Sequence, residues 1–462
     1  MARKRPINAD LPPLREPSPA EPAAAPGPPR AEPAAGERPR SEPPATRRRR
    51  RRPVPAALKA IGGLVAVALV FLVAAVLGGG GTNDAGEETA PAPVATPAEP
   101  AEEEAPSTPA AEAAEELGFP SFATSNTVRV GGADAASVGA AVALAVFPSA
   151  TPAQRPAAVA LVDEGEWQAA VAASVLMAPP LGFPLLVSSA GELPEPTEQA
   201  LEALAPAGTP AGGGAEAFAI GAAATPGTLK TARVEADGGV AALAAEIAAT
   251  REELAGRPPA HLVLAPLARP ELALPAAAWA ARSGDPVLFS GPRELPAATA
   301  RALRRHRDVP VYVLGPSSAI SSAVVREAAA IAPGVRRVSG EDAVANAIAL
   351  ARYERGGFGW NVNDPGHGFV VARADAATVA AVASPLSASG TWGPLLLTDD
   401  AARLPAALRD YLLDVKPGYT TDPTRAFYNH VWVIGDQEAI DVNQQAEIDQ
   451  LAELARIGGG QP

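Results

Sequence analysis

The chain of 462 residues contains no cysteine, which excludes disulfide bonds and thiolate chemistry. Histidine is scarce: its four copies are scattered and form neither an H-x-x-x-H nor an H-E-x-x-H pattern. A metal site needs convergent ligands, and no such set is visible, so no metal and no cofactor is expected. The sequence also lacks a G-x-S-x-G elbow and a phosphate-binding P-loop. We therefore predict that the protein is not an enzyme.

Large apolar residues are nearly absent from two segments. Residues 1–55 consist mostly of Pro, Ala, Glu and Arg, and they cannot bury enough surface to offset the entropy of ordering them. We predict a disordered, basic tail there. Residues 78–118 carry ten acidic residues and no basic one, and their prolines and like charges predict an extended linker. The part from Phe119 to Ile457 is long enough to bury a core.

One long apolar run lies between these two segments. Six consecutive arginines, Arg47 to Arg52, precede it, and no residue from Ala60 to Leu77 is charged or strongly polar. Eighteen such residues match the apolar thickness of a bilayer, so we predict a transmembrane helix over residues 56–77. The arginines are expected on the cytoplasmic side of the cell membrane, which makes the N-terminus cytoplasmic and the C-terminal domain extracytoplasmic. A disulfide-free domain outside the cell suits a bacterium.

The apolar run and the arginine block each have an alternative interpretation. A cleaved signal peptide would need a charged region of more than fifty residues, and no clear A-x-A site follows the apolar run. Nucleic-acid binding by the arginine block is disfavoured because such a block beside a membrane helix serves as a stop signal and contacts anionic lipid. No nucleic-acid partner is expected.

A short apolar pattern led by proline occurs three times in the rest of the chain. The copies are Gly182-Phe-Pro-Leu-Leu-Val-Ser188, Gly284-Asp-Pro-Val-Leu-Phe-Ser290 and Trp392-Gly-Pro-Leu-Leu-Leu-Thr398. A Leu-Pro pair follows each one at a nearly constant distance, and Arg-Val pairs at Arg129, Arg233 and Arg337 are spaced by 104 residues. We therefore predict three repeats at 126–232, 233–336 and 337–457.

Each repeat alternates strand and helix patterns. The fully apolar runs are typical of strands buried on both faces of a parallel sheet. Proline in each Leu-Pro pair marks a helix start, where its missing N–H is no loss. An aspartate after each Arg-Val pair (Asp134, Asp237 and Asp342) is expected to cap the next helix. This alternation predicts an α/β fold with three layers, α/β/α, and right-handed crossovers.

These landmarks resemble the cell wall-binding repeat 2 family. Val335-Arg-Arg-Val-Ser-Gly-Glu-Asp342 resembles the opening of a family module, Pro394-Leu-Leu-Leu-Thr398 its middle strand, and Val311-Tyr-Val-Leu-Gly315 its last strand. The resemblance covers nearly all of residues 126–457 in three copies. It implies three tandem Rossmann-like open-sheet modules in a pseudo-threefold arrangement. It also implies noncovalent attachment to anionic glycopolymers of a Gram-positive cell wall.

The clearest basic cluster is the predicted polymer-binding site. It comprises Arg301, Arg304, Arg305, His306 and Arg307, joined by Arg336 and Arg337. Guanidinium groups suit an anionic wall polymer or a lipid head group. The alternative is a solvated helix C-terminus, where cations offset the helix dipole. Charged residues at the strand ends, such as Arg373, Asp375, Asp399 and Asp400, are weaker candidates that can equally serve as loop caps.

Three functional hypotheses follow. The leading one is a membrane-anchored, noncatalytic envelope protein that contacts wall glycopolymer. The net charge of −11 on residues 119–462 opposes it, because an anionic polymer would be repelled outside a local basic patch. The second is an envelope scaffold that binds other envelope proteins and has lost polymer binding. The third is a hydrolase acting on peptidoglycan, such as an amidase, against which the missing metal ligands weigh.

Overall fold

The computed structural model describes residues 122–332, 334–389 and 392–457, all within one unit of the chain. The predicted tail (1–55), transmembrane helix (56–77) and linker (78–118) lie outside the described residues. Among the helices of the described part, none combines the length and the hydropathy needed to cross a bilayer.

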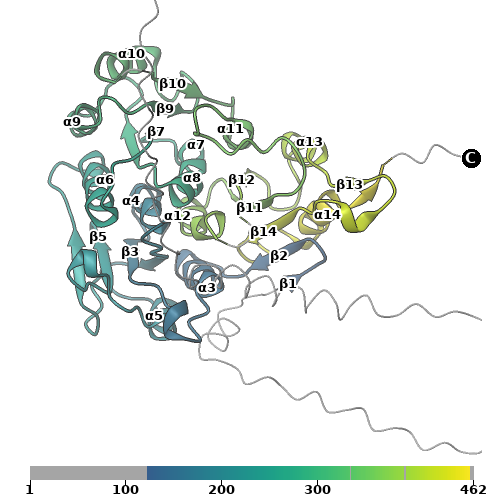
Figure 1. Ribbon diagram of the computed structural model, residues 1–462, viewed down its shortest axis with the longest axis horizontal. Helices are drawn as coiled ribbons and strands as arrows, with labels where there is room; N and C mark the ends of the chain where they lie inside the picture. Colours follow the sequence, from purple (N-terminus) through teal and green to yellow (C-terminus); the bar gives the residue numbers. More distant parts are fainter. Residues whose placement is uncertain (1–121, 333, 390–391, 458–462) are drawn as a thin grey trace, which may run out of the picture. The chain divides into compact units, whose positions relative to one another are not determined.

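Three parallel sheets with the same strand order form the described unit (Figure 1). The first has the order β4-β3-β5-β6, from β3 (Val159–Asp163), β4 (Leu185–Ser188), β5 (Ala217–Ile220) and β6 (Thr231–Val234). The second has the order β8-β7-β9-β10, from β7 (Leu262–Pro266), β8 (Val287–Ser290), β9 (Val311–Leu314) and β10 (Arg336–Val338). The third has the order β12-β11-β14-β2, from β11 (Gly368–Arg373), β12 (Leu395–Thr398), β14 (His430–Ile434) and β2 (Thr127–Val130), with β1 (Phe122–Ala123) added antiparallel at its edge.

The three proline-led runs occupy corresponding places. They form β4, β8 and β12, which are edge strands beside β3, β7 and β11, and each is buried throughout. Burial on both faces explains why these runs contain no alternating polar residues. The predicted α/β class and the equivalence of these three strands are confirmed.

The sheets are offset by one strand from the predicted repeats. Strand β6 spans the predicted start of the second repeat but pairs with β5 of the first, and β10 spans the predicted start of the third but pairs with β9 of the second. Strand β2 opens the first repeat and pairs with β14 of the third. The two ends of the described chain therefore meet in one sheet, although the repeat boundaries themselves stay a prediction.

Core residues divide each of the first two sheets into an inner and an outer face. In β3, Ala160 and Val162 belong to the central core, whereas Val159 and Leu161 belong to a separate outer cluster. In β7, Val263 and Ala265 face inward and Leu262 and Leu264 face outward in the same alternation. This is the three-layer packing expected of a sheet covered by helices on both sides.

Inner helices from the three predicted repeats meet at the centre of the unit. They are α4 (Trp167–Ala173) with η3 (Ser174–Met177), α7 (Pro270–Ala273) with α8 (Pro275–Ser283), and α12 (Ala377–Val382) with η5 (Ser384–Ser387). Helices α4, α8 and α12 lie side by side in Figure 1, and contacts join α4 to α8 and α12, and α8 to η5. Alanine makes up much of these helices, and its small side chain lets the helix backbones approach closely. At one such contact, between η3 and η5, Ser174 Oγ lies 3.0 Å from Ser384 Oγ.

The remaining helices contact one another, and some also contact inner helices of a neighbouring predicted repeat. They are α3 (Ala135–Val146), α5 (Glu195–Leu204), α6 (Val240–Ala255), α9 (Ala297–Arg305), α10 (Ser322–Ile331), α11 (Ala343–Arg352), α13 (Ala406–Asp414) and α14 (Val442–Ala452). Short elements are η2 (Pro152–Gln154), η4 (Pro210–Gly212), η6 (Pro423–Arg425) and the strand pair β13 (Gly418–Tyr419) and β15 (Ala455–Arg456).

Five of the six residues predicted to mark a helix start, three prolines and three aspartates, lie at a helix N-terminus. Pro194, Pro296 and Pro405 are the N-cap residues of α5, α9 and α13. Asp134 and Asp342 accept hydrogen bonds from backbone N–H groups in the first turns of α3 and α11. The prediction for Asp237 was wrong, because the N-cap of α6 is Gly239, with a φ of +79° that favours glycine. The helix begins at Val240, three residues after Asp237, and no side chain caps its first turn.

Candidate functional site

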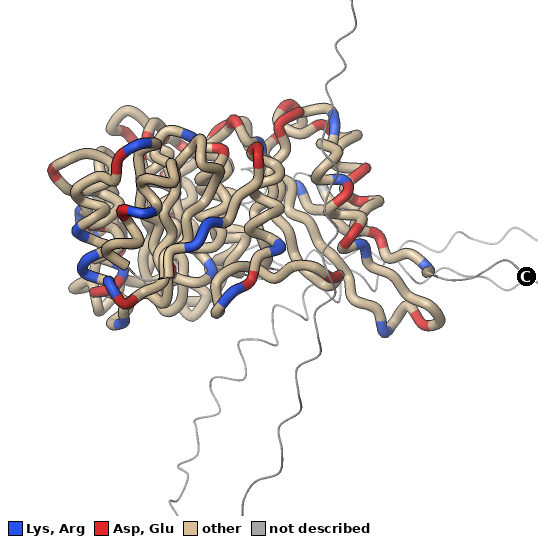
Figure 2. The backbone as a smooth tube through the Cα atoms, turned by 90° about the horizontal axis from the view of Figure 1, so that it is seen from above, with Lys and Arg blue, Asp and Glu red and all other residues tan. Residues whose placement is uncertain are grey.

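The structure divides the seven predicted basic residues into two groups. Arg301, Arg304 and Arg305 lie on α9, with His306 and Arg307 just beyond its end. Arg336 and Arg337 lie on β10. Figure 2 shows basic and acidic positions interspersed over the described unit in this view.

The guanidinium of Arg337 forms hydrogen bonds within the fold. Its Nη1 donates to the Gly315 carbonyl and its Nη2 donates to the Ile320 carbonyl at 2.6 Å. Arg336 donates to the Gly334 carbonyl at 3.3 Å. Burial lowers the pKa of Arg337, as expected for a guanidinium taken out of water. The Arg337 side chain therefore ties the loop after β9 to the strand that opens the next repeat.

The equivalent arginines do the same in the other two sheets. Arg233 donates to the carbonyls of Gly221 and Ala223, after β5. Arg129 is 1% exposed and donates to Gln445 Oε1 at 2.9 Å and to the carbonyls of three residues, namely Gly435, Asp436 and Ile440. The constant spacing of these arginines was visible in the sequence. Their role was not, because it depends on pairing between different repeats.

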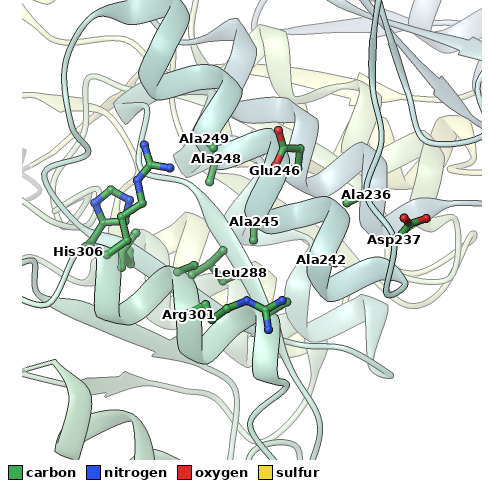
Figure 3. A pocket seen from close by; sticks show the side chains of 14 residues that line it. Ala236, Asp237, Ala242, Ala245, Glu246, Ala248, Ala249, Leu288, Arg301 and His306 are labelled. Atoms are coloured by element: carbon green, nitrogen blue, oxygen red, sulfur yellow. The ribbon is translucent and has the colours of Figure 1, made fainter.

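Arg301, Arg305 and His306 line a groove of about 340 Å³ between α9 and α6 (Figure 3). Arg304 and Arg307 are exposed and lie outside the lining, and Arg307 Nε is 3.9 Å from the Asp308 carboxylate. The basic cluster that the sequence suggested is thus only partly brought together.

Alanines form most of the floor of this groove. Ala242, Ala245 and Ala249 are three or four residues apart and so share one face of α6, with Leu262 and Leu288 of the sheet beneath. A methyl group fills little of the space between two helices. The groove stays open for this reason.

The wall opposite the arginines is acidic. Asp237 and Glu246 are exposed and line the same groove, and Figure 3 shows them across from Arg301 and His306. At one end Glu252 Oε2 lies 3.2 Å from Arg305 Nη2 and 3.5 Å from His306 Nε2.

Beyond this bridge a second hollow of about 640 Å³ continues along Gly256 and Arg257. Burial lowers the pKa of His306, and Arg305 adds to that effect while Glu252 opposes it. A His306 pKa below its ordinary value makes the ring neutral at pH 7, so Arg301 and Arg305 supply the positive charge of the groove.

The other polar candidates make local contacts. Arg373 forms a two-bond pair with Asp375, with its Nη2 2.7 Å from Oδ2, and this pair raises the pKa of Arg373 and lowers that of Asp375. Asp400 accepts from Arg403 and from the backbone N–H of Ala402. These carboxylates cap their own loops. Over the described ranges, no group of three or more His, Asp or Glu side chains could hold a metal ion.

A long loop of the third repeat contributes to the interface with the second. Phe358 stacks on Tyr312 with ring centroids 3.8 Å apart, and Tyr312 Oη donates to the Arg355 carbonyl. His261 Nδ1 lies 3.0 Å from Asp285 Oδ2, and its Nε2 lies 3.1 Å from the Gly356 carbonyl. This buried imidazole contact was not apparent from the sequence, where the four histidines appear scattered.

Comparison with known proteins shows likeness in structure. Cwp6 from Clostridium difficile superposes with a TM-score of 0.55 and 17% sequence identity over 71% of this chain and 47% of its own. Cwp8 from the same organism gives a TM-score of 0.54 and 18% identity over 71% of this chain and 52% of its own. The chain thus spans about half the length of each.

No family model matches the sequence, and no curated protein does either. At this level of identity the two solved structures show a shared fold, which supports the resemblance to cell wall-binding repeats as far as the fold is concerned.

Proposed function

We propose that this chain is a membrane-anchored, noncatalytic envelope protein whose extracytoplasmic domain binds cell wall glycopolymer. The observation that carries the proposal is the fold, which is similar to that of two cell wall proteins. Three equivalent sheets, joined into a closed series by β2, support the predicted pseudo-threefold arrangement of Rossmann-like modules. Polymer contact is assigned to the groove of Arg301 and Arg305, since both guanidinium groups are exposed there.

The proposal is tested by co-sedimentation of residues 119–462, which include the whole described core, with purified bacterial walls. Retention is expected at low salt and should fall as ionic strength rises, because exposed charges are screened within about 10 Å at 0.1 M salt. Absence of retention at low salt would end the proposal.

A second candidate is an envelope scaffold that binds protein partners. It is favoured by two aromatic side chains in the loop between β13 and β14, Phe427 and Tyr428, which are 70% and 57% exposed. Exposed aromatic side chains are enriched at protein interfaces. In-cell cross-linking from a photoreactive residue at position 427 distinguishes the two functions. A scaffold gives a discrete protein adduct, whereas a polymer binder gives none.

A further inference from the structure

The groove between α6 and α9 has walls of opposite charge. Arg301 stands on one side, and Asp237 and Glu246 stand on the other (Figure 3). Within the described residues, no ion pair of 4.0 Å or less engages any of these three side chains. Glu252 and Arg305 pair with each other further along. The open half of the groove therefore presents a cation and two anions whose charges are available to a ligand.

A ligand of one charge sign fits this arrangement poorly. A purely anionic polymer would meet Arg301 but also the carboxylates of Asp237 and Glu246, within a region whose net charge is −11. A purely cationic ligand would be repelled by Arg301 and Arg305. Complementary potential across an interface selects partners chiefly by rejecting the wrong charge pattern.

We propose that the groove binds a zwitterionic wall polymer, meaning a phosphodiester chain that also carries protonated primary amines. The proposal rests on the wall-binding function above and names its ligand class. A guanidinium such as that of Arg301 presents paired donors that match a phosphate oxygen pair. An ammonium group on the same polymer pairs with Glu246 or Asp237. The alanine floor leaves room for the uncharged part of a thin chain along α6.

The test compares retention of residues 119–462 on three preparations of purified walls, with phosphatidylethanolamine vesicles as a lipid comparison. The first is untreated, the second is N-acetylated to neutralise amines, and the third is treated with hydrofluoric acid to remove phosphodiesters. The groove variants are Arg301→Glu, Glu246→Lys and the double exchange. Matched controls are Arg326→Glu and Glu327→Lys on α10, which make the same charge changes at exposed positions outside the groove.

Both chemical treatments are expected to weaken binding of the unaltered domain. Each single groove variant should lower the affinity for untreated walls roughly fivefold, which corresponds to about 1 kcal/mol for an exposed charge contact. The double exchange should recover most of that loss, because a zwitterion can pair with the swapped charges in the reverse direction. The α10 controls should bind like the unaltered domain, and thermal unfolding should confirm that all variants fold.

Four results would overturn the inference. Tighter binding by Glu246→Lys, or indifference to N-acetylation, would show a purely anionic ligand and leave wall binding intact. Equal binding to phosphatidylethanolamine vesicles and to walls would assign the zwitterion to a lipid head group. No retention of the unaltered domain on untreated walls would remove the proposed function and this inference with it.

Discussion

At the scale of single residues, three equivalent arginines hold the sheets together, yet their surroundings differ. Arg129 is buried and satisfies carbonyl groups that would otherwise lie unpaired in the interior. Arg233 makes similar contacts at the surface. An unsatisfied buried acceptor costs its full desolvation free energy, whereas an exposed one is satisfied by water. The arginine side chain should therefore contribute more to the free energy of unfolding at position 129 than at position 233.

We predict that Arg129→Ala lowers the free energy of unfolding by about 3 kcal/mol or more, because several buried acceptors lose their donor at once. Arg233→Ala, the matched control, should cost about 1 kcal/mol or less. Urea unfolding followed by circular dichroism measures both. Equal losses would show that burial of Arg129 is not what makes it important.

The protonation of His261 predicts a pH effect on stability. Both of its ring nitrogens face acceptors, the Asp285 carboxylate and the Gly356 carbonyl, so both must carry protons to make the two hydrogen bonds. Burial lowers the pKa of His261, but the hydrogen bond and charge of Asp285, aided by the Gly356 carbonyl, outweigh it and raise the pKa above its ordinary value. The contribution of the imidazolium to stability is then fully present below pH 6.5 and is lost as pH rises through the folded-state pKa.

We expect the unaltered domain to lose stability relative to His261→Gln as the pH rises above 6.5, as measured by urea unfolding at each pH. His306→Gln serves as control, because burial lowers the pKa of His306 and its effect falls below pH 6.5. His430, whose pKa burial lowers to about 4, likewise does not titrate in the alkaline window. Parallel pH profiles of the unaltered domain and His261→Gln would contradict the assignment.

At the scale of elements, strand β2 joins the start of the described chain to the third sheet. It pairs with β14 along four residues, and Asp449 of α14 accepts from the Asn126 N–H at 2.8 Å. Removing β1 and β2 would uncover a buried strand edge, and such an edge is a template for pairing with another chain.

We predict that residues 134–462 self-associate and that a synthetic peptide of residues 119–133, added in trans, restores a monomer by occupying the β14 edge. Light scattering coupled to size-exclusion chromatography measures the change. A peptide with Arg129→Ala should restore far less monomer, since it lacks the buried guanidinium. A fragment that stays monomeric without peptide would show that β2 is dispensable.

Local sequence signals predicted the elements well but not how the repeats join. Apolar runs and Leu-Pro pairs report burial and helix starts within about ten residues, and the structure confirms them at β4, β8 and β12. The cap predicted at Asp237 was wrong because two glycines follow it and move the start of α6. The acidic wall of the groove and the stacking of Phe358 on Tyr312 arise from contacts between elements that are far apart in the sequence. No local pattern encodes those contacts.

At the scale of the whole molecule, charge and hydropathy are arranged in blocks. A basic segment, an apolar run, an acidic segment and a region of net charge −11 follow one another along the chain. On the proposed membrane anchor, anionic lipid would attract the first block and repel the last two, and this would favour a domain held away from the membrane surface. A groove that must reach wall polymer would benefit from that separation.

The proposed anchor leads to the last prediction. Between Ala60 and Leu77, eleven residues are Leu, Ile, Val or Phe, which together favour insertion by roughly 3–6 kcal/mol. The full chain, expressed in a bacterium, should therefore remain with the membrane through an alkaline carbonate wash, whereas a variant without residues 56–77 should be released. Protease added to intact protoplasts should digest the domain and spare an N-terminal tag, because the arginine block holds the tail inside. Release of the full chain by carbonate would show peripheral attachment instead, and the groove would then have to reach the wall without a fixed membrane anchor.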